Sequence, residues 1–248
     1  MPIKDYFSGH AKIYATFRPD YPNALYDFIY KHLHEKSRAW DCATGNGQVA
    51  KHLASMFDEV YATDISNKQL ENAVQASNIT YSVSSAEHTT FPDNYFDLIT
   101  VGQALHWFQR ELFYKEVMRT AKPNGLLAVW GYAVLSVDES IDELFNKFYT
   151  ETVGPYWDDA RKLVEDQYRS ISFPFEEIPA PAFSIAVEWT KQQFAGYLSS
   201  WSSTQKFINS NGFNPVDDFI TSLKNLWQDD ELKNVTFPVF LRLGRIKK

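Results

Sequence analysis

Strand-like and helical patterns alternate five times between residues 36 and 132, and this rhythm restricts the fold more than any other feature of the chain. Strands alternating with helices form a parallel sheet whose helices cover both faces. We therefore expect an α/β fold with a doubly wound, mostly parallel sheet of seven strands. The first five strands are expected at 39–42, 59–63, 79–83, 95–101 and 126–132.

The alternation stops after residue 132. Helical patterns follow at 138–153 and 158–170, then a Pro-rich stretch, an alternating strand at 183–189, a helix at 215–228 and a terminal strand in VTFPVFLRLGRI. A further helix is expected at 22–35. The predicted organisation is an N-terminal helical cap at 1–35, a sheet core at 36–132, a helical and aromatic insertion at 133–230, and a strand at 231–248 that completes the sheet.

The 248 residues, 44% of them hydrophobic, are enough for one large domain with an insertion. A formal charge of −7 disfavours binding to nucleic-acid phosphates. The chain has no apolar run of membrane-spanning length and no apolar segment of a signal peptide near its start. Its single cysteine, Cys42, cannot form an internal disulfide. We expect a cytoplasmic protein, a monomer or homodimer, without nucleic-acid, membrane or metal partners.

The loop after the first predicted strand reads DCATGNG, from Asp41 to Gly47. Glycine lets a ligand approach the backbone closely, and a glycine loop between a strand and a helix is typical of sites for adenosine-containing cofactors. Asp64 ends the second predicted strand, where a carboxylate can bind the ribose hydroxyls. A dinucleotide and S-adenosylmethionine both satisfy these features.

Asp41 favours S-adenosylmethionine. In a dinucleotide site the pyrophosphate lies against the loop and the helix start, and a carboxylate beside it is unfavourable. S-adenosylmethionine has no phosphate and carries a sulfonium and an ammonium, which a carboxylate attracts directly or through water. An NAD(P)-dependent oxidoreductase stays as the alternative, together with a non-catalytic protein that keeps the fold and the cofactor.

The string D-C-A-T-G-N-G resembles motif I of the class I S-adenosylmethionine-dependent methyltransferases, D/E-x-G-x-G-x-G, with Ala43 in place of the first glycine. Four further resemblances to this family follow in order along the chain. They are Asp64 as the ribose-binding acid, Ser85-Ala86-Glu87-His88 with Phe91-Pro92 as the adenine-side motif, Tyr95-Phe96-Asp97-Leu98-Ile99 as motif IV, and Lys122-Pro123-Asn124-Gly125 as the later turn. The resemblance implies a Rossmann-like fold and S-adenosylmethionine as cofactor, with S-adenosylhomocysteine as product.

Two more stretches resemble the trans-aconitate methyltransferase-like proteins of bacteria and fungi, which are small-molecule methyltransferases. One is Gln103-Ala104-Leu105-His106-Trp107-Phe108, and the other joins Tyr14 to Arg18-Pro19-Asp20-Tyr21-Pro22. The C-terminal TFPVFLRLGR resembles the closing strand of the same group. The resemblance is weakest from about 133 to 182, where the identity of the acceptor would be determined.

The resemblance and the positions after the strands together predict the site. The residues expected to bind the cofactor are Asp41, Ala43, Gly45, Gly47, Asp64, Ile65, Ala86, Glu87 and Gln103, with Tyr14 and Arg18 from an N-terminal lid. Those expected to bind the substrate are Tyr21, Trp107, Trp201 and Ser202, the last two on the acceptor side of the insertion. His106 is the candidate general base.

Simpler roles stay open for several of these residues. Asp41 could bond to local backbone at a strand end, Asp64 could lie near the start of a helix that Ser66 and Gln69 cap, and Glu87 could be a solvated loop residue. Gln103 could bond to a loop carbonyl instead of the cofactor, His106 could cap the next helix, and Trp201 could belong to the core. The lid residues could instead pin the N-terminal segment to the core.

Methyl transfer requires the acceptor atom in line with the methyl–sulfur bond, so the protein mainly aligns the partners and excludes water. A base is needed only where the acceptor loses a proton, and a carboxylate needs none. We expect a small-molecule O-methyltransferase, and the resemblance to the trans-aconitate methyltransferase-like proteins implies a carboxylic acid as the acceptor. A methyltransferase for protein or nucleic acid is the rival, and for nucleic acid the charge and the absence of an Asn/Asp-Pro-Pro-Tyr-type tetrapeptide after the fourth strand speak against it.

Overall fold

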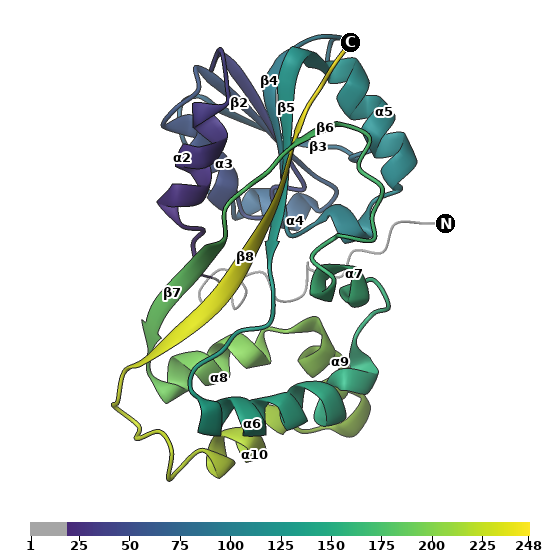
Figure 1. Cartoon of the computed structure of the whole chain (residues 1–248). Helices are drawn as coiled ribbons and strands as arrows, with labels where there is room; N and C mark the ends of the chain where they lie inside the picture. Colours follow the sequence, from purple (N-terminus) through teal and green to yellow (C-terminus); the bar gives the residue numbers. More distant parts are fainter. Residues whose placement is uncertain (1–18) are drawn as a thin grey trace.

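The protein is described by a computed structural model that covers residues 19–248 (Figure 1). Its sheet has the strand order β3-β2-β1-β4-β5-β8-β6, and β7 pairs with another part of β8. The first five strands are parallel, and β8 runs antiparallel to β5, β6 and β7. The strands are β1 (Arg38–Cys42), β2 (Glu59–Asp64), β3 (Ile79–Val83), β4 (Phe96–Gly102), β5 (Ala121–Tyr132), β6 (Glu176–Ile178), β7 (Phe183–Trp189) and β8 (Lys233–Arg245).

Helices cover both faces of the sheet because successive side chains of its central strands point to opposite sides. Leu98 of β4 belongs to the core under α2 (Asn23–Lys31) and α3 (Gln48–Ala54), which place Leu25 and Leu53 on that face. Ile99 belongs to the second core, which α5 (Arg110–Thr120) covers. The short α4 (Asn67–Glu71) follows β2. The predicted doubly wound α/β fold is confirmed.

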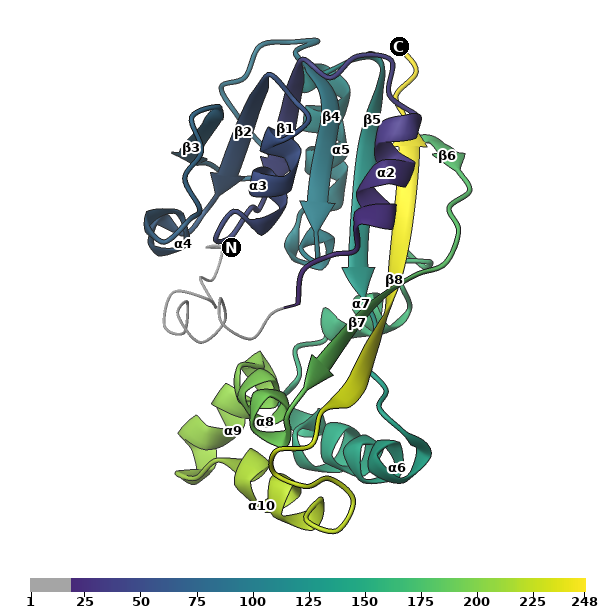
Figure 2. The same ribbon diagram turned by 90° about the vertical axis from the view of Figure 1, so that its left-hand side faces the viewer.

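The rest of the chain forms a helical module beneath the carboxyl ends of the parallel strands (Figure 2). A two-stranded ribbon of β7 and β8 connects this module to the sheet: Lys233–Val239 of β8 pairs with β7, and Val239–Arg245 pairs with β5. The module's helices are α6 (Glu139–Lys147) with a π-helical continuation η2 (Phe148–Thr152), η3 (Gly154–Tyr156), α7 (Arg161–Glu165), α8 (Lys191–Ser199), α9 (Ser202–Asn211) and α10 (Pro215–Ser222).

Several predicted elements differ from those observed. Residues 19–248 contain eight strands rather than seven, because Glu176–Ile178 adds a short edge strand beside β8. The helix expected at 158–170 is limited to α7, since Gln167 and Tyr168 adopt left-handed φ angles of 57° and 58°. The turn expected at Pro123–Gly125 lies inside β5, where Asn124 has a φ of 62°.

Helix boundaries also moved. The helix that Ser66 and Gln69 were expected to cap is the short α4, which ends at Glu71, and the Ser66 side chain makes no capping hydrogen bond to it. The helix expected to reach residue 228 ends at Ser222. The structure adds α9, which the sequence did not predict. None of the helices in the described part of the chain has the length and hydrophobicity that a bilayer crossing requires.

Candidate functional site

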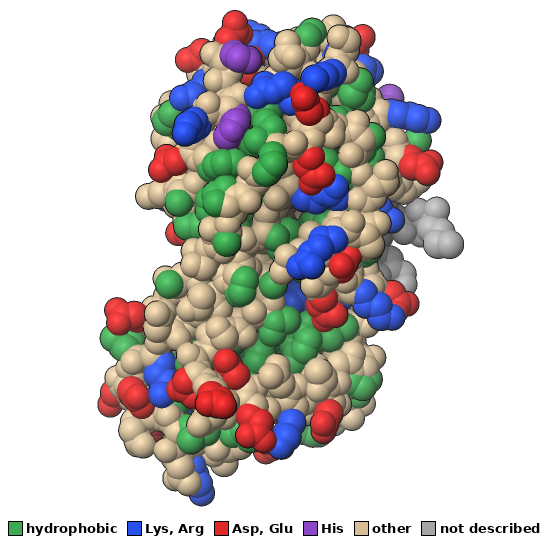
Figure 3. Space-filling view, in the orientation of Figure 1, with side chains coloured by type: hydrophobic (Ala, Val, Ile, Leu, Met, Phe, Trp, Pro, Cys, Tyr) green, Lys and Arg blue, Asp and Glu red, His purple; other side chains and the backbone are tan. Residues whose placement is uncertain are grey.

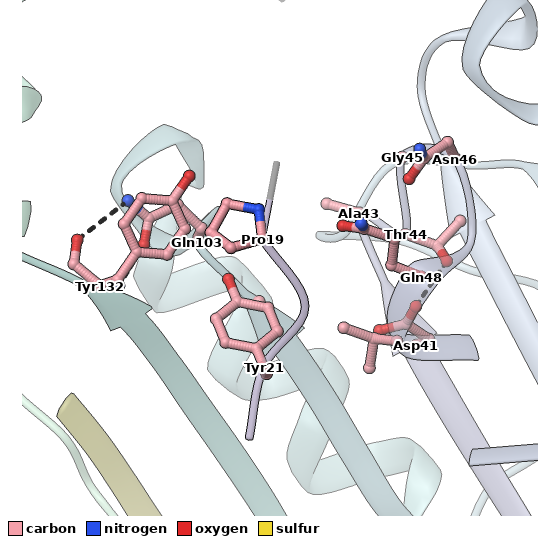
Figure 4. A pocket seen from close by; sticks show the side chains of 12 residues that line it. Pro19, Tyr21, Asp41, Ala43, Thr44, Gly45, Asn46, Gln48, Gln103 and Tyr132 are labelled. Atoms are coloured by element: carbon pink, nitrogen blue, oxygen red, sulfur yellow. Dashed lines mark hydrogen bonds between the residues drawn. The ribbon is translucent and has the colours of Figure 1, made fainter. Parts of the chain in front are cut away.

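The sequence-predicted loop lies at the carboxyl end of β1, where open α/β sheets bind their ligands. It borders a cleft of about 550 Å³, part of which is open to solvent. Figure 4 shows the loop on one side of this cleft and the aromatic residues on the other. The lining residues are Pro19, Tyr21, Asp41, Ala43, Thr44, Gly45, Asn46, Gln48, Val49, Gly102, Gln103 and Tyr132.

The loop bends through three residues with left-handed φ angles, which are 56° at Ala43, 57° at Gly45 and 81° at Gly47. A Cβ atom added at Gly47 would lie 2.3 Å from the hydroxyl oxygen of Tyr81, so this position requires glycine for space as well as for conformation. Ala43 adopts a left-handed conformation that costs an ordinary residue about 1–2 kcal/mol. The loop therefore holds its backbone close to the cleft and stores strain at the position where motif I usually has glycine.

Asp41 is a buried carboxylate, only 1% exposed, at the wall of this cleft. Its two oxygens accept hydrogen bonds from the hydroxyls of Thr44 (2.5 Å) and Thr100 (2.8 Å). Burial raises the pKa of Asp41 to about 6, against the opposing effect of these two hydrogen bonds. Within residues 19–248, Asp41 has no ion-pair partner, so this part of the chain leaves the charge of the cleft wall unneutralised.

Asp64, at the end of β2, faces the same loop. One carboxylate oxygen accepts a hydrogen bond from the Gly45 amide and the other from the Ser66 amide, both at 2.9 Å. These bonds hold the carboxylate at the carboxyl end of β2, the position from which an acidic residue binds ribose hydroxyls in open α/β folds. The next residue, Ile65, is 41% exposed and offers an apolar surface beside the carboxylate.

Ala86 and Glu87 follow β3, and the structure fixes them against the sheet. Ala86 is buried in the core under α5. The Glu87 carboxylate accepts a hydrogen bond of 2.9 Å from the amide of Gln109, the residue that precedes α5. Glu87 therefore has a structural partner at a helix start, where a negative charge is stabilised.

Gln103 joins the ends of β4 and β5. Its side-chain oxygen accepts a hydrogen bond of 2.8 Å from the Tyr132 amide, and its side-chain nitrogen donates one of 3.4 Å to the Tyr132 carbonyl oxygen (Figure 4). The backbone of Gln103 has a left-handed φ of 56°. A Cβ atom at Gly131 would lie 2.2 Å from this oxygen, so Gly131 leaves the room that the Gln103 side chain occupies. Gln103 thus bonds to local backbone and still lines the cleft.

The side chains of Tyr21 and Tyr132 lie across the cleft from the loop (Figure 4). The fully buried ring of Trp130 packs against Tyr21. The ring of Tyr21 meets Trp130 edge-on at 5.6 Å and is 6.2 Å from Tyr132. Rings of this kind attract cations such as a sulfonium. Tyr14 and Arg18, predicted for the lid, lie outside the described residues.

His106 and Trp107 form a short turn, η1 (Leu105–Trp107), after β4. The Nδ1 atom of His106 is 2.7 Å from the Tyr168 hydroxyl oxygen. Burial, together with the nearby charges of Arg161 and Arg110, lowers the pKa of His106 to about 3. The imidazole is therefore neutral and weakly basic at neutral pH, and neither it nor Trp107 is among the residues that line the cleft.

Trp201 and Ser202 lie at the start of α9 in the helical module. Trp201 is 5% exposed and packs within an aromatic core. Its ring neighbours are Phe145, Phe148, Tyr149, Trp157 and Tyr197. The structure therefore places Trp201 in packing contacts that the sequence pattern left open as an alternative.

Sequence reasoning missed Thr44 and Thr100 as partners of Asp41. Thr44 lies inside motif I, and Thr100 is the residue of β4 that pairs in register with Asp41. Reading the strand-end residues of β4 for hydroxyls would have found it.

The fold and the cleft define a Rossmann-like protein whose glycine loop suits an adenosine-containing cofactor. A family model described as a methyltransferase domain matches residues 40–129. A Dictyostelium discoideum protein named as a methyltransferase is 34% identical over 249 residues, which cover 97% of this chain and 95% of that protein.

A solved structure from Anaeromyxobacter dehalogenans, described as a type II methyltransferase, superimposes with a TM-score of 0.87 at 33% identity and covers 94% of this chain and 99% of that chain. The Saccharomyces cerevisiae protein CRG1, described as an S-adenosylmethionine-dependent methyltransferase, is 24% identical over 92% of this chain and 91% of that protein. The chain belongs to the class I S-adenosylmethionine-dependent methyltransferases, and S-adenosylmethionine is its cofactor.

Proposed function

We propose that the protein transfers the methyl group of S-adenosylmethionine to a small organic acceptor, at the oxygen of a carboxylic acid. The observation that carries the choice of site is the buried Asp41 carboxylate, which accepts hydrogen bonds from two hydroxyls and, among residues 19–248, has no ion-pair partner. A positively charged cofactor supplies the missing charge, whereas a pyrophosphate would add to the repulsion.

Each of the described site residues then has a role. Asp41 attracts the cationic methionine part of the cofactor, the loop from Ala43 to Gly47 lets the cofactor approach the backbone, and Asp64 accepts hydrogen bonds from the ribose hydroxyls. Ile65 and Ala86 border the adenine, with Glu87 holding that segment against α5. Tyr21 and Tyr132 place aromatic faces near the sulfonium.

When bound, S-adenosylmethionine supplies an electrophilic methyl group, so the protein needs to align the acceptor and exclude water. A carboxylate acceptor needs no general base. This agrees with His106, whose lowered pKa and hydrogen bond to Tyr168 make it a weak proton acceptor. The resemblance of residues 103–108 to the trans-aconitate methyltransferase-like proteins also supports an acidic acceptor.

A small, soluble acceptor agrees with the surface charge. The formal charge is −7, and on the face in Figure 3 basic and acidic side chains are interspersed rather than gathered in one basic area. A nucleic-acid acceptor would favour a basic surface. We propose that the enzyme acts in the cytoplasm as a monomer or homodimer.

The test is methyl-ester formation by the full chain from a panel of carboxylic acids, compared with phenols and amines of similar size. Volatile methanol released from the products by base identifies esters. Turnover of acids supports the proposal, and turnover confined to phenols or amines removes the carboxylate acceptor.

A further inference from the structure

The segment between α4 and β3 is bonded to the motif I loop. The backbone amide of Val74, in this segment, donates a hydrogen bond of 3.1 Å to the carbonyl oxygen of Asn46. Asn46 lies between the two glycines of the loop and lines the cleft (Figure 4). The position of Val74 therefore affects the position of a residue that borders the cofactor cleft.

Tyr81 of β3 bonds to the same residue. Its hydroxyl donates a hydrogen bond of 2.6 Å to the Val74 carbonyl oxygen. Val74 is thus bonded to the loop through its amide and to the sheet through its carbonyl group. Burial, with the nearby charge of Asp41, raises the pKa of Tyr81 to about 12, so the hydroxyl keeps its proton at neutral pH and remains a donor.

The Tyr81 hydroxyl also packs directly on Gly47. A Cβ atom at Gly47 would lie 2.3 Å from the hydroxyl oxygen and 3.2 Å from the Cζ atom of the ring. The phenol therefore occupies the space that any other residue at position 47 would need. Tyr81 holds two consecutive loop residues, Asn46 through Val74 and Gly47 by direct contact.

The elements that carry these contacts are themselves fixed. Tyr81 pairs in register with Ala62 of β2. The side-chain nitrogen of Asn78 donates hydrogen bonds of 2.8 and 3.0 Å to the carbonyl oxygens of Ala54 and Phe57 at the end of α3. The loop, by contrast, has three left-handed residues, and two of them are glycines, which adopt other backbone angles readily. Contacts from a fixed neighbour therefore restrict the loop to one conformation.

We propose that Tyr81 is a positioning residue for the cofactor: with Val74, it holds the Asn46–Gly47 peptide in the conformation that binds S-adenosylmethionine. Without the Tyr81 hydroxyl, the loop occupies this conformation for a smaller part of the time, and the apparent affinity falls by the same factor. The proposal concerns the cofactor, so it does not depend on which acceptor is methylated.

The binding test compares Tyr81→Phe with Tyr61→Phe in calorimetric titrations with S-adenosylhomocysteine at pH 7. Tyr61, on the neighbouring strand β2, donates a hydrogen bond of 2.7 Å to Glu59, and neither of these two residues lines the cleft. Both variants lose a hydroxyl donor, so both should lose a little stability in urea unfolding. Only Tyr81→Phe should weaken binding, by about threefold to tenfold, the net value of one hydrogen bond. Unchanged affinity in Tyr81→Phe, or an equal loss in Tyr61→Phe, would overturn the proposal.

Hydrogen exchange of the ligand-free protein tests the loop itself. The amides of Gly45 and Gly47 donate hydrogen bonds of 2.9 and 3.0 Å. In Tyr81→Phe both amides should lose at least threefold of their protection, and in Tyr61→Phe they should keep it. The wild type gives a test that needs no variant. If its Gly47 amide opens more than tenfold more often than its Val74 amide, the loop moves while Val74 stays bonded, and the proposal is wrong.

A double-variant cycle tests the contact between Tyr81 and Gly47. Tyr81→Phe removes the oxygen at 2.3 Å and leaves the ring carbon at 3.2 Å. The loss of S-adenosylhomocysteine affinity caused by Gly47→Ala should therefore be at least threefold smaller in the Tyr81→Phe background than in the wild type. Equal losses in the two backgrounds would show that the two residues act independently, which contradicts the proposal.

Discussion

Helix α3 belongs to the sheet and its covering helices, which form the cofactor half of the molecule, and helix α9 belongs to the helical module. The two helices differ in how clearly the sequence predicts where they begin. Neither helix has a side-chain cap, because its N-cap residue is Gly47 in one case and Trp201 in the other. The backbone before α3 must adopt left-handed angles, and glycines mark it. The chain before α9 adopts ordinary angles, with a φ of −69° at Trp201, and no residue type is required. A position that requires an unusual backbone conformation can be recognised in a sequence by its glycine. The side chains that surround a position are known only from the folded structure.

The largest expected effect comes from two glycines, one in each half, with nearly the same φ. Gly47→Ala adds a clash with Tyr81 to the left-handed strain and should destabilise the protein by about 2–4 kcal/mol. Gly212→Ala, which has open space around its Cβ position, should lose only about 1 kcal/mol. Urea unfolding measures both values, and equal losses would show that Tyr81 moves aside.

The next effect concerns Asp41. Asp41→Asn should weaken S-adenosylhomocysteine binding by about 10–100-fold, the value of about 1.5–3 kcal/mol for a charged contact. The folded-state pKa of about 6 lies above the ordinary value of 3.8, so the folded state binds the proton more tightly and stability is lost as pH rises from about 4 to 6. Asp41→Asn removes this loss, so at pH 7 the ligand-free variant should be at least as stable as the wild type.

Asp97→Asn is the matched control for the predicted direction of the stability change at Asp41. Asp97 is buried like Asp41 but pairs with Lys122 at 2.6 Å and accepts hydrogen bonds from the Ser37 and Arg38 amides. Asp97→Asn should therefore destabilise the ligand-free protein and leave cofactor affinity unchanged.

Calorimetric titrations between pH 5 and 8 should also show that the wild-type affinity for S-adenosylhomocysteine rises with pH and that the affinity of Asp41→Asn stays flat. The opposite trend would contradict an ionised Asp41 in the complex.

A smaller effect is expected at His106, at the boundary of the two halves. If the acceptor is a carboxylate, His106→Gln should lower kcat/KM by less than about tenfold, whereas loss of a general base costs about 10²–10⁴-fold. Steady-state kinetics with the best acid of the panel decides between these ranges. Tyr168→Phe, which removes the hydroxyl that contacts His106, should match His106→Gln if the pair only positions η1.

The smallest expected effect is an increase in the free energy of unfolding. Ala43→Gly should stabilise the protein by about 0.5–1 kcal/mol, because relief of the left-handed strain exceeds the entropy lost from a more flexible unfolded chain. Asn124→Gly, at a φ of 62°, should gain less because asparagine tolerates this conformation better. A loss of stability at Ala43 would show that its methyl group packs usefully.

Local backbone rules explain what the sequence could predict. The strand positions followed from apolar runs. The capping box of Thr190 and Gln193 at the start of α8 is likewise a local feature, because both of its hydrogen bonds lie within four residues. Strand β6 could not be predicted, since its three residues are held by the edge of β8 rather than by a pattern of their own. Helix α9 was missed because its first turn, Ser202 to Gln205, is polar and yet partly buried by neighbours distant in sequence.

The candidate site also has a part that the sequence predicts and a part that it does not. Asp41, Ala43, Gly45 and Gln103 were expected to bind the cofactor, and the structure brings them to one cleft. Their individual roles stay predictions. The residues that bind the acceptor could not be predicted from the sequence. A tryptophan such as Trp201 fits a core and a pocket equally well until its neighbours are known.

The thirteen residues of β8 serve both halves of the enzyme, with Val239 paired to β5 on one side and to β7 on the other. The two halves thus share one continuous strand, which pairs with a strand of each half. The hydrogen bonds that pair β8 with β5 and β7 resist sliding of the helical module along the sheet. The length of this one strand therefore sets how far the helical module lies from the strand ends that border the cleft.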